Sequence, residues 1–181
     1  NGPWSSLIGA CREYFGVERL HMPSRLDRET SGVVCFARSA ELGSRLQKAM
    51  QNRQVRKSYF AILEGVLEGR HDVRAALGKD RTSAVAVKQA VVAVEDGGYP
   101  AETRFDVLEA RGGFTLARVT PLTGRLHQIR VHAAWLGAPL AGDKLYGPDS
   151  TLSLAFVERG FTDRLAAALA PALEAANVEP I

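Results

Sequence analysis

The sequence predicts an α+β domain with a mostly antiparallel, mixed β-sheet core and flanking helices. Strand-like segments separated by tight-turn signals dominate residues 84–120. Segments of helical period lie before and after this stretch. The chain has 181 residues and no internal repeat, which is enough for one well-buried core. We therefore expect residues 1–181 to form a single domain.

The first third of the chain predicts two helices with a strand between them. Residues 5–15 place apolar side chains at i, i+4, i+7 and i+8, namely Leu7, Cys11, Tyr14 and Phe15. Gly16 is expected to end this helix. The apolar run at 32–39 predicts a buried strand. Ser39 is then the expected N-cap of a helix over 40–52.

The middle of the chain predicts strands. Residues 56–66 alternate, with Tyr59, Ala61 and Leu63 on one face and Phe60 and Ile62 on the other. Three further strands are expected at 84–95, 101–110 and 114–122, with turns at 95–100 and 111–113.

After the last of these strands, the spacing of apolar residues becomes helical again. A helix is expected over 123–137, with Thr123 as N-cap and Gly137 as its end, and an apolar stripe formed by Leu126, Ile129, Ala133 and Leu136. A loop is expected at 142–149. An Ala/Leu helix is expected from Thr162, with an interruption at Pro171.

Composition narrows the class of protein only a little. Hydrophobic residues make up 46% and charged residues 24% of the chain, and the net charge of +3 is compatible with nucleic acid without identifying it. No apolar run approaches the roughly 20 residues of a membrane helix, so we expect no membrane span. The two cysteines, Cys11 and Cys35, are interpreted as reduced core residues of a cytoplasmic protein. The first residues show no signal-peptide pattern and no Met, which suggests an excerpt of a longer protein.

The segment "RLDRETSG" places the acid Asp27 between Arg25 and Arg28. One interpretation is a solvated salt-bridge cluster on a turn. The other is that Asp27 does chemistry on a polyanion, which the arginines hold while they keep the acid ionised. A position on a loop before a buried strand favours the second interpretation, because scaffolded loops often carry function.

A second polar cluster lies in "TGRLHQIRVH". On the expected helix Arg125, Gln128 and His132 fall at i, i+3 and i+7, opposite the apolar stripe. A solvated polar face is the plain alternative for each of them. Arg125 differs because it is expected in the first turn, where free N–H groups already favour an anion.

Tyr59 follows a basic stretch with Arg53, Arg56 and Lys57. Such a tyrosine either stacks on an RNA base or packs as a half-buried core residue. The sequence has no paired metal-ligand spacing, no glycine-rich nucleotide loop and no G-x-S-x-G turn, so zinc, nucleotide-cofactor and serine-hydrolase chemistry have no support.

Three segments taken together resemble the motif blocks of the RluA-type pseudouridine synthases: "RLDRETSG", "KSYFAILEG" and "PLTGRLHQIRVHAAWLGAPLAGDKLYG". Their order and spacing fit from about residue 20 to 160. The resemblance implies a pseudouridine synthase-like catalytic domain, lacking some N- and C-terminal family segments. It also implies isomerisation of uridine in ribosomal or transfer RNA, without cofactor or metal.

The resemblance also implies roles for individual residues. Asp27 corresponds to the essential aspartate, Arg25 to the arginine that helps displace the target base, Tyr59 to the tyrosine that packs on it, and Arg125 to the basic partner of the aspartate. Arg28 joins them as an RNA-binding residue. Gln128, Arg130 and His132 are expected to support the site. We expect RNA as the partner, no membrane partner, and a monomer.

Two alternatives remain. The first is a protein that keeps the fold and binds RNA without catalysis. Such a protein is expected to have a broken motif, but Asp27, Tyr59 and Arg125 are all present. A glycosidase-like hydrolase would need two working carboxylates, Asp27 with Glu29 or Asp143, but Glu29 is only two residues from Asp27 and no aromatic sugar platform is evident.

Overall fold

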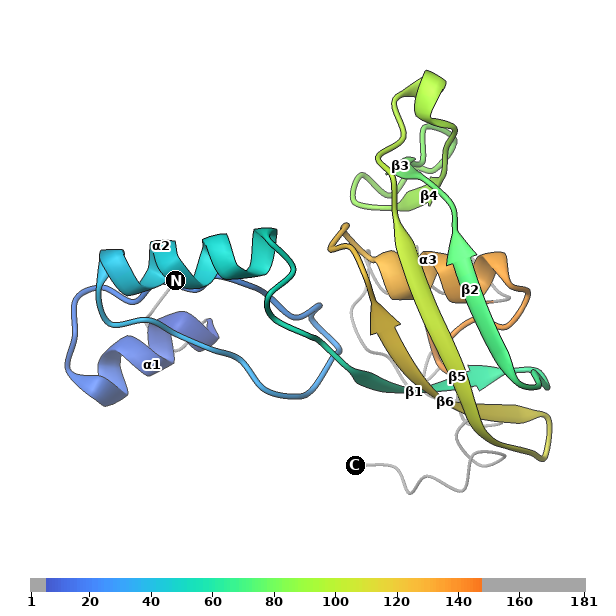
Figure 1. Cartoon of the computed structure of the whole chain (residues 1–181), viewed down its shortest axis with the longest axis horizontal. Helices are drawn as coiled ribbons and strands as arrows, with labels where there is room; N and C mark the ends of the chain where they lie inside the picture. The colour runs from blue at the N-terminus through green and yellow to red at the C-terminus, as the bar shows by residue number, and fades with distance from the viewer. Residues whose placement is uncertain (1–5, 148–181) are drawn as a thin grey trace. The chain divides into compact units, whose positions relative to one another are not determined.

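The computed structural model describes residues 6–147, and the chain divides into two compact units, Asn1–Arg56 and Lys57–Ile181. Figure 1 shows the elements of both. The helix expected from Thr162, with its break at Pro171, lies outside the described residues. Within residues 6–147, no helix combines the length and apolar character that crossing a bilayer requires.

The first unit contains helices α1 (Leu7–Phe15) and α2 (Ala40–Gln51), both begun by the side chain of a serine. Ser39 Oγ accepts a hydrogen bond from the Leu42 N–H, as the sequence predicts for an N-cap. Gly16 ends α1 in the left-handed conformation, at φ 60°, which glycine adopts without steric cost. Both helices and these two boundaries therefore confirm the sequence prediction.

The buried strand expected at 32–39 is absent, and this prediction was wrong. The described residues of the first unit contain only an isolated bridge between His21 and Ala37. Val33 is 89% exposed and Cys35 is exposed as well, so Cys35 is no core residue. A run of β-branched residues favours extended backbone, but a strand also needs a neighbour to pair with.

The second unit contains a four-stranded antiparallel sheet in the order β1-β6-β5-β2. Its strands are β1 (Tyr59–Glu64), β2 (Arg70–Arg74), β5 (Glu102–Arg111) and β6 (Phe114–Pro121). A two-stranded sheet pairs β3 (Leu77–Lys79) with β4 (Gln89–Val91), and the 3₁₀ turn η2 (Val94–Asp96) follows. Helix α3 (Gln128–Trp135) comes after the sheet strands. This arrangement confirms the predicted α+β class.

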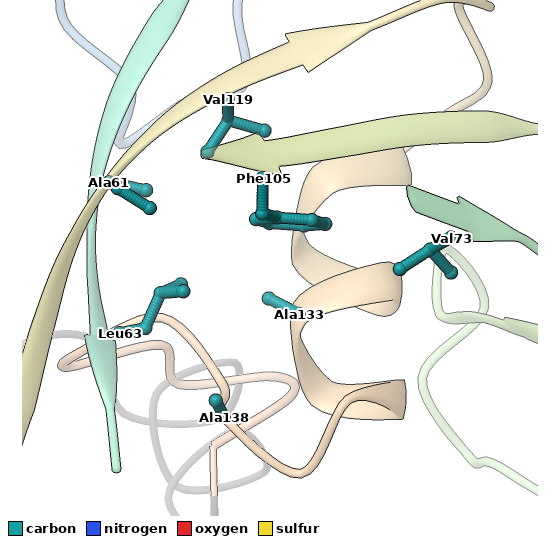
Figure 2. Close-up of a cluster of buried hydrophobic side chains, with 8 residues drawn as sticks. Ala61, Leu63, Val73, Phe105, Val119, Ala133 and Ala138 are labelled. Atoms are coloured by element: carbon teal, nitrogen blue, oxygen red, sulfur yellow. The ribbon is translucent and has the colours of Figure 1, made fainter. Parts of the chain in front are cut away.

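The core of the second unit lies between α3 and one face of the four-stranded sheet. Figure 2 shows side chains of β1, β2, β5 and β6 pointing toward Ala133 of α3. The buried cluster consists of Ala61, Leu63, Val73, Phe105, Ala117, Val119, Ala133 and Ala138. Ala61 and Leu63 are buried while Phe60 is 71% exposed, as the predicted alternation of this strand requires.

The opposite face of this sheet is exposed and carries charged side chains beside apolar ones such as Phe60 and Ile62. Asp72 of β2 forms ion pairs with Arg70 and with Arg104 of the neighbouring β5. Only Val73 is fully buried in β2. The strand therefore lacks the apolar alternation that sequence reading requires, and it was missed.

Two boundaries differ from the sequence prediction. The long strand expected at 84–95 shrinks to β4, because a turn closed by the Lys88 N–H to the Val85 carbonyl precedes it and η2 follows. Helix α3 begins at Gln128, with His127 in the N-cap position, so Thr123 does not cap it. Gly137, at φ 75°, follows the end of α3 as expected.

Candidate active site

Asp27 lies in the first unit, in the loop between the two helices. The Thr30 N–H donates a hydrogen bond to the Asp27 carbonyl over 3.0 Å and closes a turn there. Asp27 is half-buried, whereas Arg25, Arg28 and Glu29 are exposed. The predicted loop position is confirmed. The buried strand expected after this loop is absent, so the expected position at the edge of a sheet was wrong: the loop leads into no strand within the described part of this unit.

Tyr59 is the first residue of β1 in the second unit, paired in register with Val119 of β6. It is half-buried and packs against the core cluster of this unit. The core interpretation of Tyr59 therefore applies in part, because the residue is only partly buried.

Arg125 lies three residues before the first residue of α3, in an exposed loop, so the expectation of a place in the first helical turn was wrong. Its Nε–H donates to the Pro100 carbonyl over 3.1 Å. Its guanidinium carbon lies 5.5 Å from the centroid of the Tyr99 ring. Both partners belong to the segment that leads into β5.

Gln128 is only 4% exposed, so the predicted solvated polar face was wrong at this position. Its Oε1 accepts hydrogen bonds from the Thr123 hydroxyl at 2.7 Å and the Arg125 N–H at 2.9 Å. Its Nε2 donates to the Glu102 carbonyl and to Thr103 Oγ1, both at 2.9 Å. All four hydrogen-bonding positions of the amide are used. Gln128 therefore connects α3, β5 and the Arg125 loop.

His132 is fully buried, which also corrects its expected place on a solvated face. Its Nε2 lies 2.9 Å from the Ala75 carbonyl, which can only accept, so Nε2 carries the hydrogen. Its Nδ1 is then the acceptor for the Thr103 hydroxyl at 2.8 Å. Desolvation lowers the pKa of His132 and exceeds the opposing effect of the Ala75 carbonyl. The imidazole is thus a neutral part of the fold.

Leu126 is 44% exposed and lies before α3, so it does not belong to a buried stripe of that helix. The next residue, His127, has a positive φ of 54°, which is uncommon outside glycine. Its Nδ1 lies 2.8 Å from the Tyr146 hydroxyl, which also accepts the Gln89 N–H at 2.9 Å. Backbone strain of this kind persists only where surrounding contacts hold it, and here it sets the entry of the chain into α3.

Arg130 forms a two-pronged ion pair with Asp143, with nitrogen to oxygen distances of 2.7 Å and 2.6 Å. The side chain of Asp143 is 3% exposed, and its Oδ1 also accepts the N–H groups of Leu145 and Tyr146. Burial alone would raise the pKa of Asp143, but the hydrogen bonds and charge of Arg130 outweigh it and lower the pKa. The Asp143 carboxylate is therefore used in holding Arg130 and the loop at 142–147, which makes it a poor second carboxylate for a hydrolase.

Sequence reasoning missed the residues that position these groups. Thr103 stands in a strand where a threonine is ordinary, and no local pattern indicates its contact with α3. Thr123 is expected as an N-cap of this helix, and its hydroxyl instead donates to the Gln128 side chain. Tyr99 falls in a segment that the sequence predicts only as a turn. The "GDKLYG" segment was the one available signal for Tyr146, whose ring lies 4.9 Å from the Arg130 guanidinium carbon. Among residues 6–147, no three His, Cys, Asp or Glu side chains gather as a metal ion would require.

The fold and the second unit's polar network define an α+β domain that presents an exposed, oriented arginine, a forked donor suited to phosphate or carboxylate groups. The sequence profile of the RNA pseudouridylate synthase family matches residues 7–135. The chain belongs to this family, and the RluA-type resemblance of the three motif blocks is thereby confirmed.

Individual relatives agree with the family profile. Pseudouridylate synthase RPUSD2 of Homo sapiens is 38% identical over 130 residues, which cover 72% of this chain and 23% of the human protein. Ribosomal large subunit pseudouridine synthase D of Nitrosomonas europaea is 35% identical over 155 residues, covering 83% of this chain and 44% of the relative. The chain thus spans less than half the length of either relative.

A solved structure shares the fold. Human RNA Pseudouridylate Synthase Domain Containing 1 superposes with a TM-score of 0.69 at 32% sequence identity. The superposition covers 80% of this chain and 61% of the human one. The pseudouridine synthase-like fold predicted from the sequence is therefore confirmed.

Proposed function

We propose that this chain carries the catalytic core of an RNA pseudouridine synthase, which converts selected uridines of a structured RNA to pseudouridine. The observation that carries the proposal is the family match across residues 7–135, which includes the aspartate loop, the β1 tyrosine and the Arg125 loop. Relatives named for the large ribosomal subunit favour ribosomal RNA as the substrate, ahead of transfer RNA.

The reaction is an isomerisation, so its atoms balance without a co-reactant. The bond between ribose C1′ and uracil N1 breaks, the base turns, and a new bond joins C1′ to C5. The hydrogen on C5 leaves as a proton, and N1 gains one. In the proposal, the Asp27 carboxylate acts at C1′ or on the base while the glycosidic bond is broken.

The remaining proposed roles follow from charge, exposure and shape. Arg25 and Arg28 are exposed beside Asp27 in the chain and are suited to phosphate. Half-buried Tyr59 offers a ring on which an unstacked uracil can pack, which offsets part of the cost of a few kcal/mol for removing a base from its stack. Arg125 supplies a second forked donor, with Gln128, Arg130 and His132 as supporting residues of its loop and helix.

The test uses RNA transcripts that carry tritium at uridine C5, one set ribosomal and one set transfer RNA. The 181-residue chain is expected to release tritium into water from the ribosomal set, and nucleoside analysis should show one pseudouridine for each tritium released. A folded chain that binds these RNAs but releases no tritium from either set would contradict the proposal and favour the binding-only alternative. Free uracil that keeps its C5 tritium, in place of pseudouridine, would favour a hydrolase instead.

A further inference from the structure

We propose that Tyr99 is a positioning residue for Arg125, holding its guanidinium group in the orientation in which it meets the RNA. This inference rests on the proposed function, because it takes Arg125 as a residue of the RNA site. Nothing in the motif blocks marks Tyr99, which lies upstream of the block that contains Arg125.

The main chain of Arg125 is already fixed without Tyr99. The Arg125 N–H donates to Gln128 Oε1 over 2.9 Å, and the Gln128 N–H donates to the Arg125 carbonyl over 3.2 Å. Gln128 is itself held by the buried hydrogen bonds to β5. What remains free to vary is the rotamer of the long Arg125 side chain, which loses conformational entropy when it is fixed.

Two consecutive residues of the β5 entry select that rotamer. The Pro100 carbonyl accepts the Nε–H, and the Tyr99 ring lies 5.5 Å from the guanidinium carbon, within the range of a cation–π interaction. Among the described residues, no hydrogen bond engages the two terminal nitrogens of Arg125. These nitrogens are the donors that a phosphate or carboxylate uses, so the two contacts orient the group and leave its fork available.

Tyr99 is well suited to this task because its backbone is rigid while its ring is exposed. Its N–H donates to the Leu77 carbonyl over 2.8 Å, and its carbonyl accepts the Leu77 N–H at 2.9 Å. The preceding Gly98 is buried, and a Cβ at that position would overlap the carbonyl of Val92, so the turn requires glycine there. Tyr99 as a residue is 64% exposed, so removal of its ring should disturb the site more than the fold.

The decisive experiment is a set of kinetic variants in the tritium-release assay. Tyr99→Ala is expected to lower kcat/KM for RNA about two- to fivefold, the strength of an exposed cation–π contact, because Arg125 then meets the RNA less often in the right orientation. Tyr99→Phe keeps the ring and should behave as wild type. In an Arg125→Ala background, Tyr99→Ala should cause no further loss, because it acts through Arg125.

A spectroscopic readout separates this inference from the proposed function. The ¹H–¹⁵N resonance of the Arg125 Nε–H should shift when Tyr99 becomes Ala and hold its place when it becomes Phe, whether or not the RNA reacts. Wild-type kinetics and an unmoved resonance in Tyr99→Ala would overturn the inference. So would an additive loss in the Arg125→Ala background, which would make Tyr99 an RNA contact in its own right. Absence of tritium release by the wild type alone would contradict only the proposed function.

Discussion

The loops of Asp27 and Arg125 are built in different ways, although the proposal assigns both to one reaction. The Asp27 turn is a local structure, closed by the Thr30 N–H and placed between two helices in a unit whose described residues form one isolated β-bridge. The Arg125 loop is tied through Gln128 to β5 and α3 by buried side-chain hydrogen bonds. A local hydrogen bond thus closes the turn that carries Asp27, whereas long-range hydrogen bonds hold the loop that carries Arg125.

The largest expected effect on stability concerns the ion pair between Arg130 of α3 and the buried Asp143. Asp143→Ala removes the carboxylate that pairs with Arg130, whose side chain is 20% exposed, and should lower the free energy of unfolding by about 3 kcal/mol. Urea unfolding measures this. The matched control is Asp72→Ala, which removes a carboxylate from the exposed cluster with Arg70 and Arg104 and should change stability little. Equal losses in the two variants would contradict the account of the second unit.

Gln128→Met tests the connection between the core and the Arg125 loop. The substitution keeps the volume but leaves the Arg125 N–H, the Glu102 carbonyl and two threonine hydroxyls without the amide, and we expect a loss of about 2 kcal/mol in the free energy of unfolding. Activity should fall beyond what the unfolded fraction explains, because the arginine loop is released. A variant with native stability and native turnover would show that the Gln128 hydrogen bonds do not hold the Arg125 loop.

A smaller effect is expected from pH. The pKa of His132 is lowered in the folded chain, so between that value and its unfolded value of about 6.5 only the unfolded chain binds the proton. Stability should therefore fall as the pH drops below about 6.5. Asp143 acts in a lower window, since its lowered pKa gives stability that is lost as the pH falls below about 3.9 and through the folded value.

Thermal unfolding of wild type and His132→Gln between pH 7.5 and 5 measures the first of these windows. The variant should show a shallower dependence on pH, whatever its absolute stability, because it lacks the titrating group. The same slope in both proteins would contradict the assignment of His132 as a buried neutral imidazole.

The same contrast explains what could be predicted from the sequence. Patterns confined to a few residues predicted the Ser39 cap, the Gly16 end and the alternating faces of β1 correctly. The prediction of a strand at 32–39 was wrong because strand pairing depends on a neighbouring strand, which no local pattern reveals.

For the polar network, the sequence prediction erred by placing buried residues on the surface. Gln128 and His132 look like surface residues because they are polar and lie off the apolar stripe, yet Thr103 of β5 satisfies both in the core. Contacts between residues 25 or more positions apart leave no periodic trace in a single sequence. The roles of Asp27, Arg25, Arg28 and Tyr59 stay predictions, supported by the motifs and by family membership.

The most direct test of the central claim is the rate of tritium release from C5-labelled RNA by Asp27→Asn beside Glu29→Gln. Both variants remove one carboxylate charge from the same short loop, so charge alone does not distinguish them. Asp27→Asn is expected to lose at least about three orders of magnitude in rate while it stays folded and binds RNA, and Glu29→Gln is expected to stay near wild type. Tritium release by Asp27→Asn at the wild-type rate would contradict the claim that this carboxylate carries the reaction.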